Sequence, residues 1–240
     1  MTEFAKIGYY DLIWEARKNR LDQSVGRLEE MSRISRVMNR HSQNSCLLVG
    51  HRGVGKTALM FAWAKQIALS QAQPALPVVL LEADSFYALN ANLPAVFAKY
   101  KEALESMPPA IVCMDNFGQL IYNKPALLGH MLHLIKPLVL RGKIQFLFSI
   151  ETTELKWLEN EQPNFLNLFE MVMIKAPIKS QQLQILAQAY IKFNRDKNIA
   201  VTADIFELIL ELVERFQVLG HAPASAVGLL DESLAFAKSS

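Results

Sequence analysis

The residues best suited to chemistry lie in the segment GHRGVGKT, residues 50–57. The segment fits the pattern G-x-x-x-x-G-K-[ST], and it stands between an apolar run of strand length and a stretch with helical spacing, which is the context that the pattern requires. Gly53 and Gly55 allow the backbone to turn its N–H groups inward, and the start of a helix adds partial positive charge. The segment therefore predicts a phosphate-binding loop rather than a plain connecting turn.

Two side chains of this loop have predicted roles of their own. The Lys56 ammonium is expected to reach the β- and γ-phosphates of a nucleotide, and the Thr57 hydroxyl is expected to bind Mg²⁺. The predicted nucleotide-binding residues of the loop are Gly50, Arg52, Gly53, Val54, Gly55, Lys56, Thr57 and Ala58. We therefore expect ATP or ADP, together with Mg²⁺, as the ligand.

A second chemical position ends the apolar run AIVCMD, residues 110–115. Asp115 stands where a P-loop ATPase holds a carboxylate for the Mg²⁺ of its nucleotide, at the end of a buried strand. Asp is also common in turns and helix caps, but the phosphate-binding loop upstream favours the metal role. The next residue is Asn116, and its side-chain amide cannot take a proton from water.

A parallel sheet is needed to position these residues, and the sequence contains suitable strands. Near-continuous apolarity is typical of parallel strands that are covered on both faces. Five such runs occur, at residues 46–50, 77–83, 110–115, 144–150 and 171–176. Segments with helical spacing lie between them, for example at residues 57–69 and 92–107. This alternation predicts an α/β fold with a five-stranded parallel sheet.

After Pro177 the strand pattern ends and three amphipathic helices are predicted, over residues 180–195, 202–216 and 223–238. Thr202 is suited to capping the second of them. We therefore expect two domains, a large α/β domain over residues 1–177 and a small all-helical domain over residues 178–240.

Charge argues against nucleic acid as a partner. The chain has 25 Lys and Arg against 23 Asp and Glu, a formal net charge of +2, which gives no broad basic field. Arg33, Arg36 and Arg40 share one face of a predicted helix, but Glu29 and Glu30 adjoin them. A solvated face or a subunit contact is the favoured interpretation.

Composition also bears on the compartment. Cys46 and Cys113 each lie inside a predicted buried strand, where cysteine acts as a small apolar residue, and no metal or disulfide pattern is present. No uninterrupted apolar run reaches the roughly 18 residues that a membrane span needs. The first residues do not resemble a signal peptide. We expect a cytoplasmic protein without membrane insertion.

Longer segments share a pattern with one known family. They are residues 11–38, with Ala16, Leu21, Asp22, Gly26, Arg27 and Glu30; residues 134–145 (LIKPLVLRGKIQ); residues 169–177; and residues 221–235. Together with the loop and Asp115, they resemble the first ATPase module of the Clp/Hsp100 unfoldases, within the AAA+ group. The resemblance implies an AAA+ nucleotide-binding domain followed by a helical lid domain. It also implies that residues 25–27 frame the adenine, which adds Val25 and Gly26 to the nucleotide-binding residues and leaves Arg27 structural.

The sequence departs from this family at the residues that cleave ATP. Asn116 stands where the family has the glutamate that activates the attacking water. Asn167 and Leu168 stand at the family's paired arginine finger, and Ser225 stands at the lysine of its lid helix. The substrate-gripping pore loop has no counterpart between Asp84 and Leu93.

The family's sensor-1 threonine pair is also displaced. It falls on Ile150 and Glu151 without gaps, or on Thr152 and Thr153 if the loop shifts by two residues. Loss of a general base lowers the rate of hydrolysis by roughly 10²–10⁴-fold, and loss of an arginine finger lowers it by roughly 10³–10⁵-fold. We therefore expect nucleotide binding with slow hydrolysis at most.

Two carboxylates are possible replacements for the missing base. Glu82 and Asp84 follow the neighbouring predicted strand and could point toward the same water, although solvent-facing positions are favoured for both.

Three functions fit this reading. The first is a degenerate Clp-like subunit whose nucleotide state controls binding to a partner protein in a larger assembly, alone or with AAA+ subunits as a homo- or hetero-oligomer. The second is an active AAA+ ATPase acting on nucleic acid, of the helicase-loader or transposition-regulator type. The third is a structural protein whose phosphate-binding loop is a relic.

Overall fold

The computed structural model describes residues 9–70, 76–82, 93–194, 199–216 and 221–239 of the chain. Its contacts divide the chain into two compact units. The first comprises Met1–Ser24, Leu28–Val49 and Lys56–Met173, and the second comprises Val25–Arg27, Gly50–Gly55 and Ile174–Ser240. The domain boundary near residue 177 stays a prediction, and each unit is described below by itself.

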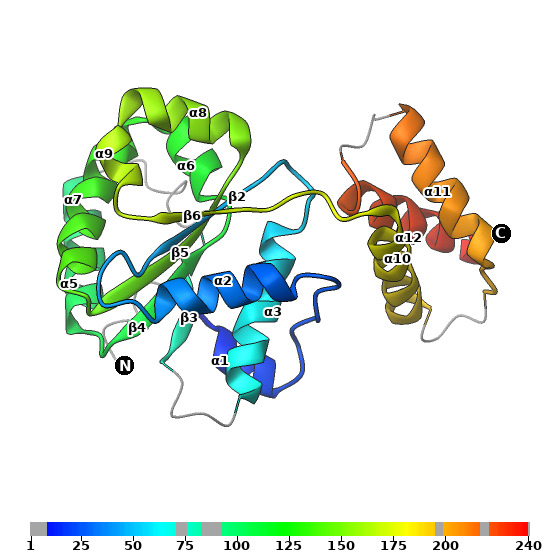
Figure 1. Cartoon of the computed structure of the whole chain (residues 1–240), viewed down its shortest axis with the longest axis horizontal. Coiled ribbons are helices and arrows are strands. Elements are labelled where there is room, and N and C mark those ends of the chain that lie inside the picture. The colour runs from blue at the N-terminus through cyan, green and yellow to red at the C-terminus, as the bar shows by residue number, and fades with distance from the viewer. Residues whose placement is uncertain (1–8, 71–75, 83–92, 195–198, 217–220, 240) are drawn as a thin grey trace. The chain divides into compact units, whose positions relative to one another are not determined.

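A six-stranded sheet forms the centre of the first unit, with the strand order β1-β3-β4-β5-β2-β6 (Figure 1). The strands are β1 (Tyr10–Asp11), β2 (Cys46–Val49), β3 (Val78–Leu80), β4 (Ala110–Met114), β5 (Ile144–Ile150) and β6 (Glu170–Met173). Strands β2 to β6 pair with one another in parallel, and they correspond to the five apolar runs of the sequence. The α/β fold with its parallel sheet is therefore confirmed.

The sixth strand, β1, was not predicted. It pairs antiparallel with β3 at one edge of the sheet, with Tyr10 opposite Leu80 and Asp11 opposite Val79. Two residues are too few to show the alternation from which a strand is inferred. Asp11 also accepts a hydrogen bond from the backbone N–H of Trp14 at 3.0 Å, so the same residue ends the strand and caps the following helix.

Helices cover both faces of this sheet (Figure 1). Those of the first unit are α1 (Leu12–Arg17), α2 (Leu28–Met38), α3 (Lys56–Leu69), α5 (Leu93–Ser106), α6 (Phe117–Asn123), α7 (Ala126–Leu140), α8 (Thr152–Glu161) and α9 (Pro163–Leu166). Helices α1, α2 and α3 pack on one side, and α5 to α9 pack on the other. Coverage on both faces is why the strand sequences are apolar without alternation.

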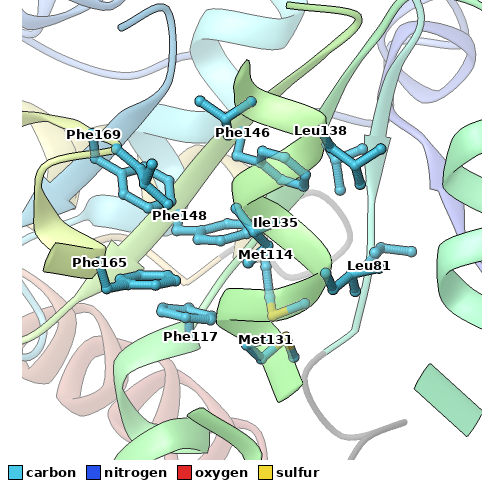
Figure 2. Close-up of a cluster of buried hydrophobic side chains, with 14 of the residues drawn as sticks. Leu81, Met114, Phe117, Met131, Ile135, Leu138, Phe146, Phe148, Phe165 and Phe169 are labelled. Carbon is cyan, nitrogen blue, oxygen red and sulfur yellow. The ribbon is translucent and has the colours of Figure 1, made fainter. Parts of the chain in front are cut away.

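The core on the α5–α9 side is rich in aromatic side chains. Phe117 stacks on Phe148 with ring centroids 4.5 Å apart and on Phe165 with centroids 5.5 Å apart. Figure 2 shows these rings grouped together in the buried cluster. Such stacked pairs stabilise a core beyond the area that they bury. The ends of β4 and β5 therefore rest on a rigid support.

The second unit is helical from α10 (Lys179–Phe193) through α11 (Ala203–Phe216) to α12 (Ala224–Ser239). These bounds match the three helices predicted from the sequence to within two residues. Its core contains Leu186, Ile209, Leu210, Val213, Ala226, Leu230 and Leu234. The residues come from all three helices, and in α11 and α12 they recur at intervals of three or four, which is the spacing of one buried helix face.

Candidate nucleotide-binding site

The carboxyl ends of β4 and β5 bring the first functional residues together. Met114 is paired with Phe148, so the next residues, Asp115 and Ser149, lie side by side. Successive side chains of a strand point to opposite faces. Met114 and Phe148 belong to the aromatic core, which directs Asp115 and Ser149 to the other face, where α3 packs.

Two hydroxyl groups hold the Asp115 carboxylate. Thr57 Oγ1 donates to Oδ2 and Ser149 Oγ donates to Oδ1, each at 2.5 Å, and Ser149 Oγ also accepts the backbone N–H of Asn116 at 2.8 Å. The structure thus brings together Thr57 and Asp115, the two predicted Mg²⁺ ligands. Ser149 was not predicted, although a hydroxyl residue inside the apolar run IQFLFSI was a visible signal.

Lys56 lies in the same unit, at the first position of α3, with 8% of its surface exposed. Burial lowers the pKa of its ammonium, and the negative charges of Glu151, Asp115 and Glu154 oppose that shift. A buried cation beside several carboxylates is stabilised by added negative charge. The environment of Lys56 is thus suited to an anionic ligand such as a phosphate group.

The start of α8 supplies two of those carboxylates. Glu154 is buried, and its Oε2 accepts the backbone N–H of Glu151 at 2.8 Å. Burial raises the pKa of Glu154 above its usual range. Gly118 allows this packing, because a β-carbon there would collide with Glu154 Oε2 and with Ile150 Cγ1. Gly118 therefore marks a close approach of α6 to α8.

Asn116 occupies the position expected for the catalytic base. It is exposed, and its backbone is left-handed with φ of 52° and ψ of 28°. Asn tolerates this conformation better than most residues. Its side chain offers no carboxylate. Of the two possible replacements, Glu82 is exposed and Asp84 lies outside the described residues.

The phosphate-loop residues Gly50–Gly55 belong to the second unit. Gly53 and Gly55 have φ of 81° and 97°, as the predicted turn requires. A β-carbon on Gly53 would lie 2.7 Å from the carbonyl oxygen of His221, whereas one on Gly55 would meet nothing within 4 Å. Gly53 is therefore needed for close packing, and Gly55 for backbone conformation alone.

Other residues of the loop differ in exposure. Arg52 is exposed, as is Ala58, the third residue of α3, whereas Val54 is buried. Contact of Arg52, Val54 and Ala58 with a nucleotide stays a prediction, and for Val54 burial leaves the backbone as the group expected to make it.

The segment Val25–Arg27 also belongs to the second unit. Arg27 is buried, and its Nη2 donates to the carbonyl oxygens of Val54 and Lys175, both at 2.9 Å. These bonds fit the structural role expected for Arg27, because the guanidinium fixes the backbone of the phosphate-binding loop. Gly26, with φ of 66°, packs against the side-chain amide of Gln181. That Val25 and Gly26 frame a base stays a prediction.

The structure places the remaining departures from the family pattern. Asn167 follows the last residue of α9, and Leu168 is buried, so neither supplies the cation of an arginine finger. Ser225 is buried, and within the described part of the chain its hydroxyl has no hydrogen-bond partner. Ile150 ends β5 and is buried.

The sensor-1 threonines of the shifted reading lie inside helix α8. Thr152 is half-buried and Thr153 is exposed. Glu151, which precedes them, has extended backbone and directly follows strand β5.

Thr57 and Asp115 fit a magnesium ion, because both present oxygen atoms, which this ion prefers, at hydrogen-bond distance from one another. Thr57 and Asp115 would hold the ion, which would supply positive charge to neutralise the phosphate groups of a nucleotide. Among the described residues there is no group of three or more His, Cys, Asp or Glu side chains that could hold a metal ion. None of the described helices combines the length and apolarity needed to cross a membrane.

Comparison with known proteins agrees with the resemblance seen in the sequence. The chain is 26% identical over 234 residues to the AAA+ ATPase ClpV1 of Pseudomonas aeruginosa and 27% identical over 236 residues to heat shock protein 104 of Schizosaccharomyces pombe. Each alignment covers 94% of this chain and 26% of the relative, so the chain spans about a quarter of the length of these proteins. No protein-family model matches the chain.

Solved structures show the same fold. The S. cerevisiae Hsp104:casein complex in its extended conformation superposes with a TM-score of 0.83 at 22% identity, over 99% of this chain and 42% of that one. The S. cerevisiae Hsp104-ADP complex gives a TM-score of 0.83 at 21% identity, over 97% of this chain and 34% of that one. The chain therefore has the AAA+ fold of Hsp104, and its curated relatives are Clp/Hsp100 ATPases.

Proposed function

We propose that this chain is a nucleotide-binding Clp-like AAA+ module that hydrolyses ATP slowly by itself and acts as a nucleotide-dependent scaffold or adaptor for a partner protein. One observation carries the proposal. The groups that bind phosphate and Mg²⁺ are retained in mutual contact, because Thr57 and Asp115 share a hydrogen bond and Lys56 is buried beside carboxylates. The groups that complete cleavage in the relatives' family are replaced.

The replacements separate binding from turnover. Asn116 gives no base at the usual position, and Asn167 and Leu168 give no arginine. Arginine can also be supplied in trans, as the GTPase-activating proteins do for their targets. An assembly with complete AAA+ subunits, as a homo- or hetero-oligomer, is therefore the setting in which we expect the module to act.

Nucleic acid is the less favoured partner. Two members of the basic stripe on α2, Arg33 and Arg40, donate to the carboxylate of Glu170 at 3.0 and 3.2 Å. Their charge is directed to β6 of their own unit, which weakens the stripe as a phosphate-binding surface.

Thermal unfolding with and without nucleotide tests the proposal. A ligand present at 100 times its dissociation constant stabilises the folded state by about 2.7 kcal/mol, so Mg-ATP and Mg-ADP are each expected to raise the melting temperature. Steady-state turnover of the purified chain is expected to stay well below about one per second, the lower end for typical enzymes.

Partner binding is tested by pull-down from the native host with and without nucleotide. Capture of a protein only in the nucleotide-loaded state supports the adaptor role. Absence of any thermal shift would show that the loop is a relic, and turnover typical of an efficient ATPase would remove the claim of slow hydrolysis.

A further inference from the structure

One carboxylate in the first unit follows a strand that lies between β4 and β2, the strands that lead to the residues predicted to bind Mg²⁺ and phosphate, and it is not the one that the family uses. Glu151 directly follows β5, which lies between β4 and β2 in the sheet. On one side Ile150 pairs with Val49, the last residue before the phosphate-binding loop. On the other side Asp115, the predicted Mg²⁺ ligand, is level with Ser149. Glu151 is therefore flanked by the strands that lead to both parts of the predicted site.

The backbone directs Glu151 toward α3. Its φ of −83° and ψ of 158° are extended, so the alternation of β5 continues through this residue. Glu151 thus faces the same side as Ser149, whose hydroxyl holds Asp115. Helix α3, which begins at Lys56, packs on this side.

Electrostatics agree with this placement. Among the carboxylates that raise the pKa of Lys56, Glu151 has the largest effect, ahead of Asp115 and Glu154. Interaction between charges falls with distance. Glu151 therefore acts electrostatically on the ammonium that is expected to hold the β- and γ-phosphates.

Glu151 supplies a carboxylate, one of the side-chain groups that act as general bases. It is half-buried. Its neighbour Glu154 differs, because it is buried and already accepts the Glu151 backbone N–H. That bond also fixes the backbone from which the Glu151 side chain projects.

We propose that Glu151 is the general base for ATP cleavage at this site, taking the role that Asn116 cannot perform. This inference rests on the proposed nucleotide-binding function and concerns the slow turnover of the same site. The Glu151 carboxylate accepts a proton from water while the water oxygen bonds to the γ-phosphorus. The bond between that phosphorus and the β–γ bridging oxygen breaks, which yields ADP and phosphate, and the proton then passes to phosphate or solvent.

A single-turnover experiment tests the assignment. The full chain, in excess over Mg-ATP, is sampled over time and the bound nucleotide is separated into ATP and ADP. Glu151→Gln is expected to slow the conversion by about 10²-fold, the lower end for loss of a general base. Glu159→Gln, which makes the same change at an exposed position of the same helix, is expected to leave the rate unchanged.

Binding is measured separately in the same variants. The rise in melting temperature with Mg-ADP and with the slowly cleaved analogue ATPγS is expected to be the same in the wild type, Glu151→Gln and Glu159→Gln. A base acts on the attacking water, so its removal lowers cleavage without weakening the hold on nucleotide.

A rescue variant distinguishes a base from a residue that merely positions Lys56. Asn116 and Glu151 follow neighbouring strands, so Asn116→Glu returns a carboxylate to the same end of the sheet. In the Glu151→Gln background this second change is expected to restore cleavage at least tenfold.

The inference would be overturned if Glu151→Gln cleaved ATP at the wild-type rate, or if the wild type bound ATP and never cleaved it. It would also be overturned if Glu151→Gln lost both cleavage and stabilisation by Mg-ADP and Asn116→Glu did not restore cleavage. A wild type that shows no stabilisation by any nucleotide would instead overturn the proposed function itself.

Discussion

Two adjacent residues at the end of β4 have opposite surroundings. Asp115 is half-buried, with both carboxylate oxygens bonded to hydroxyl groups, whereas Asn116 is exposed in a left-handed backbone conformation. The first is the predicted Mg²⁺ ligand, and the second stands at the position where the family has its catalytic glutamate. The contrast shows that these two neighbouring positions depend on different contacts, so one can change while the other is retained.

The largest effect is expected from removing the side chain that is predicted to bind the phosphates. Lys56→Ala deletes the cation that is expected to hold the β- and γ-phosphates, so the stabilisation of about 2.7 kcal/mol by saturating Mg-ADP should disappear. Thermal unfolding with and without Mg-ADP measures it. Lys156→Ala, at an exposed position of α8, is the control and should keep the full shift. A retained shift in Lys56→Ala would contradict the placement of the phosphates.

The next largest effect is expected from overpacking the buried contact around Gly118, near the residues discussed for ATP cleavage. Gly118→Ala places a β-carbon in α6 against Glu154 Oε2 of α8 and against Ile150 Cγ1 at the end of β5. Overpacking of this kind costs about 1–3 kcal/mol of unfolding free energy. Urea denaturation measures the loss. Gly129→Ala, which meets nothing within 4 Å in helix α7, should be neutral or stabilising, and equal losses at both positions would contradict the stated cause.

Restoring a carboxylate at the family's position for the base is expected to raise turnover about tenfold. This corresponds to lowering the activation barrier by about 1.4 kcal/mol. Asn116→Glu adds a carboxylate beside the metal ligand Asp115. The left-handed backbone costs a residue other than Gly or Asn about 1 kcal/mol of stability, so the variant should also melt earlier. Steady-state phosphate release measures the rate. Asn116→Gln keeps an amide and should give no gain.

The smallest effect concerns the ion pairs of Glu170, which involve none of the residues predicted to bind nucleotide or activate water. Arg33 and Arg40 hold the pKa of Glu170 below its usual value of 4.5 by hydrogen bonding to its carboxylate. Because the pKa of Glu170 is lower in the folded state than in the unfolded state, its ion pairs with Arg33 and Arg40 contribute fully to folding stability above pH 4.5. This contribution is lost as the pH falls through the pKa of the folded state.

For this partly exposed group Glu170→Gln should cost at most about 1 kcal/mol at pH 7. The difference from the wild type should shrink in acid. Thermal unfolding at pH 7 and below pH 4 measures it, and a difference that grows in acid would contradict the sign.

The strand sequences predicted the sheet well because burial on both faces leaves a strong local pattern. Residues 144–150 form β5 with the predicted bounds, and the three C-terminal helices lie where their periodicity indicated. The pairing of Thr57 with Asp115 also followed from motif spacing alone, since the carboxyl ends of parallel strands meet at one edge.

Other parts of the site depend on register, which the sequence does not display. The contact of Ser149 with Asp115 requires that Met114 be level with Phe148. The direction of Glu151 requires an extended backbone at a residue that the sequence alone could equally assign to a loop.

The short strand β1 has a consequence for how the purified chain behaves. A sheet edge exposes a row of N–H and C=O groups onto which another chain can add a strand. Tyr10 and Asp11 occupy that row along β3, and Asp11 places a charge there. A version of the chain that begins after Asp11 would leave β3 uncovered, and self-association through the bare edge, rather than loss of the fold, would then limit its solubility.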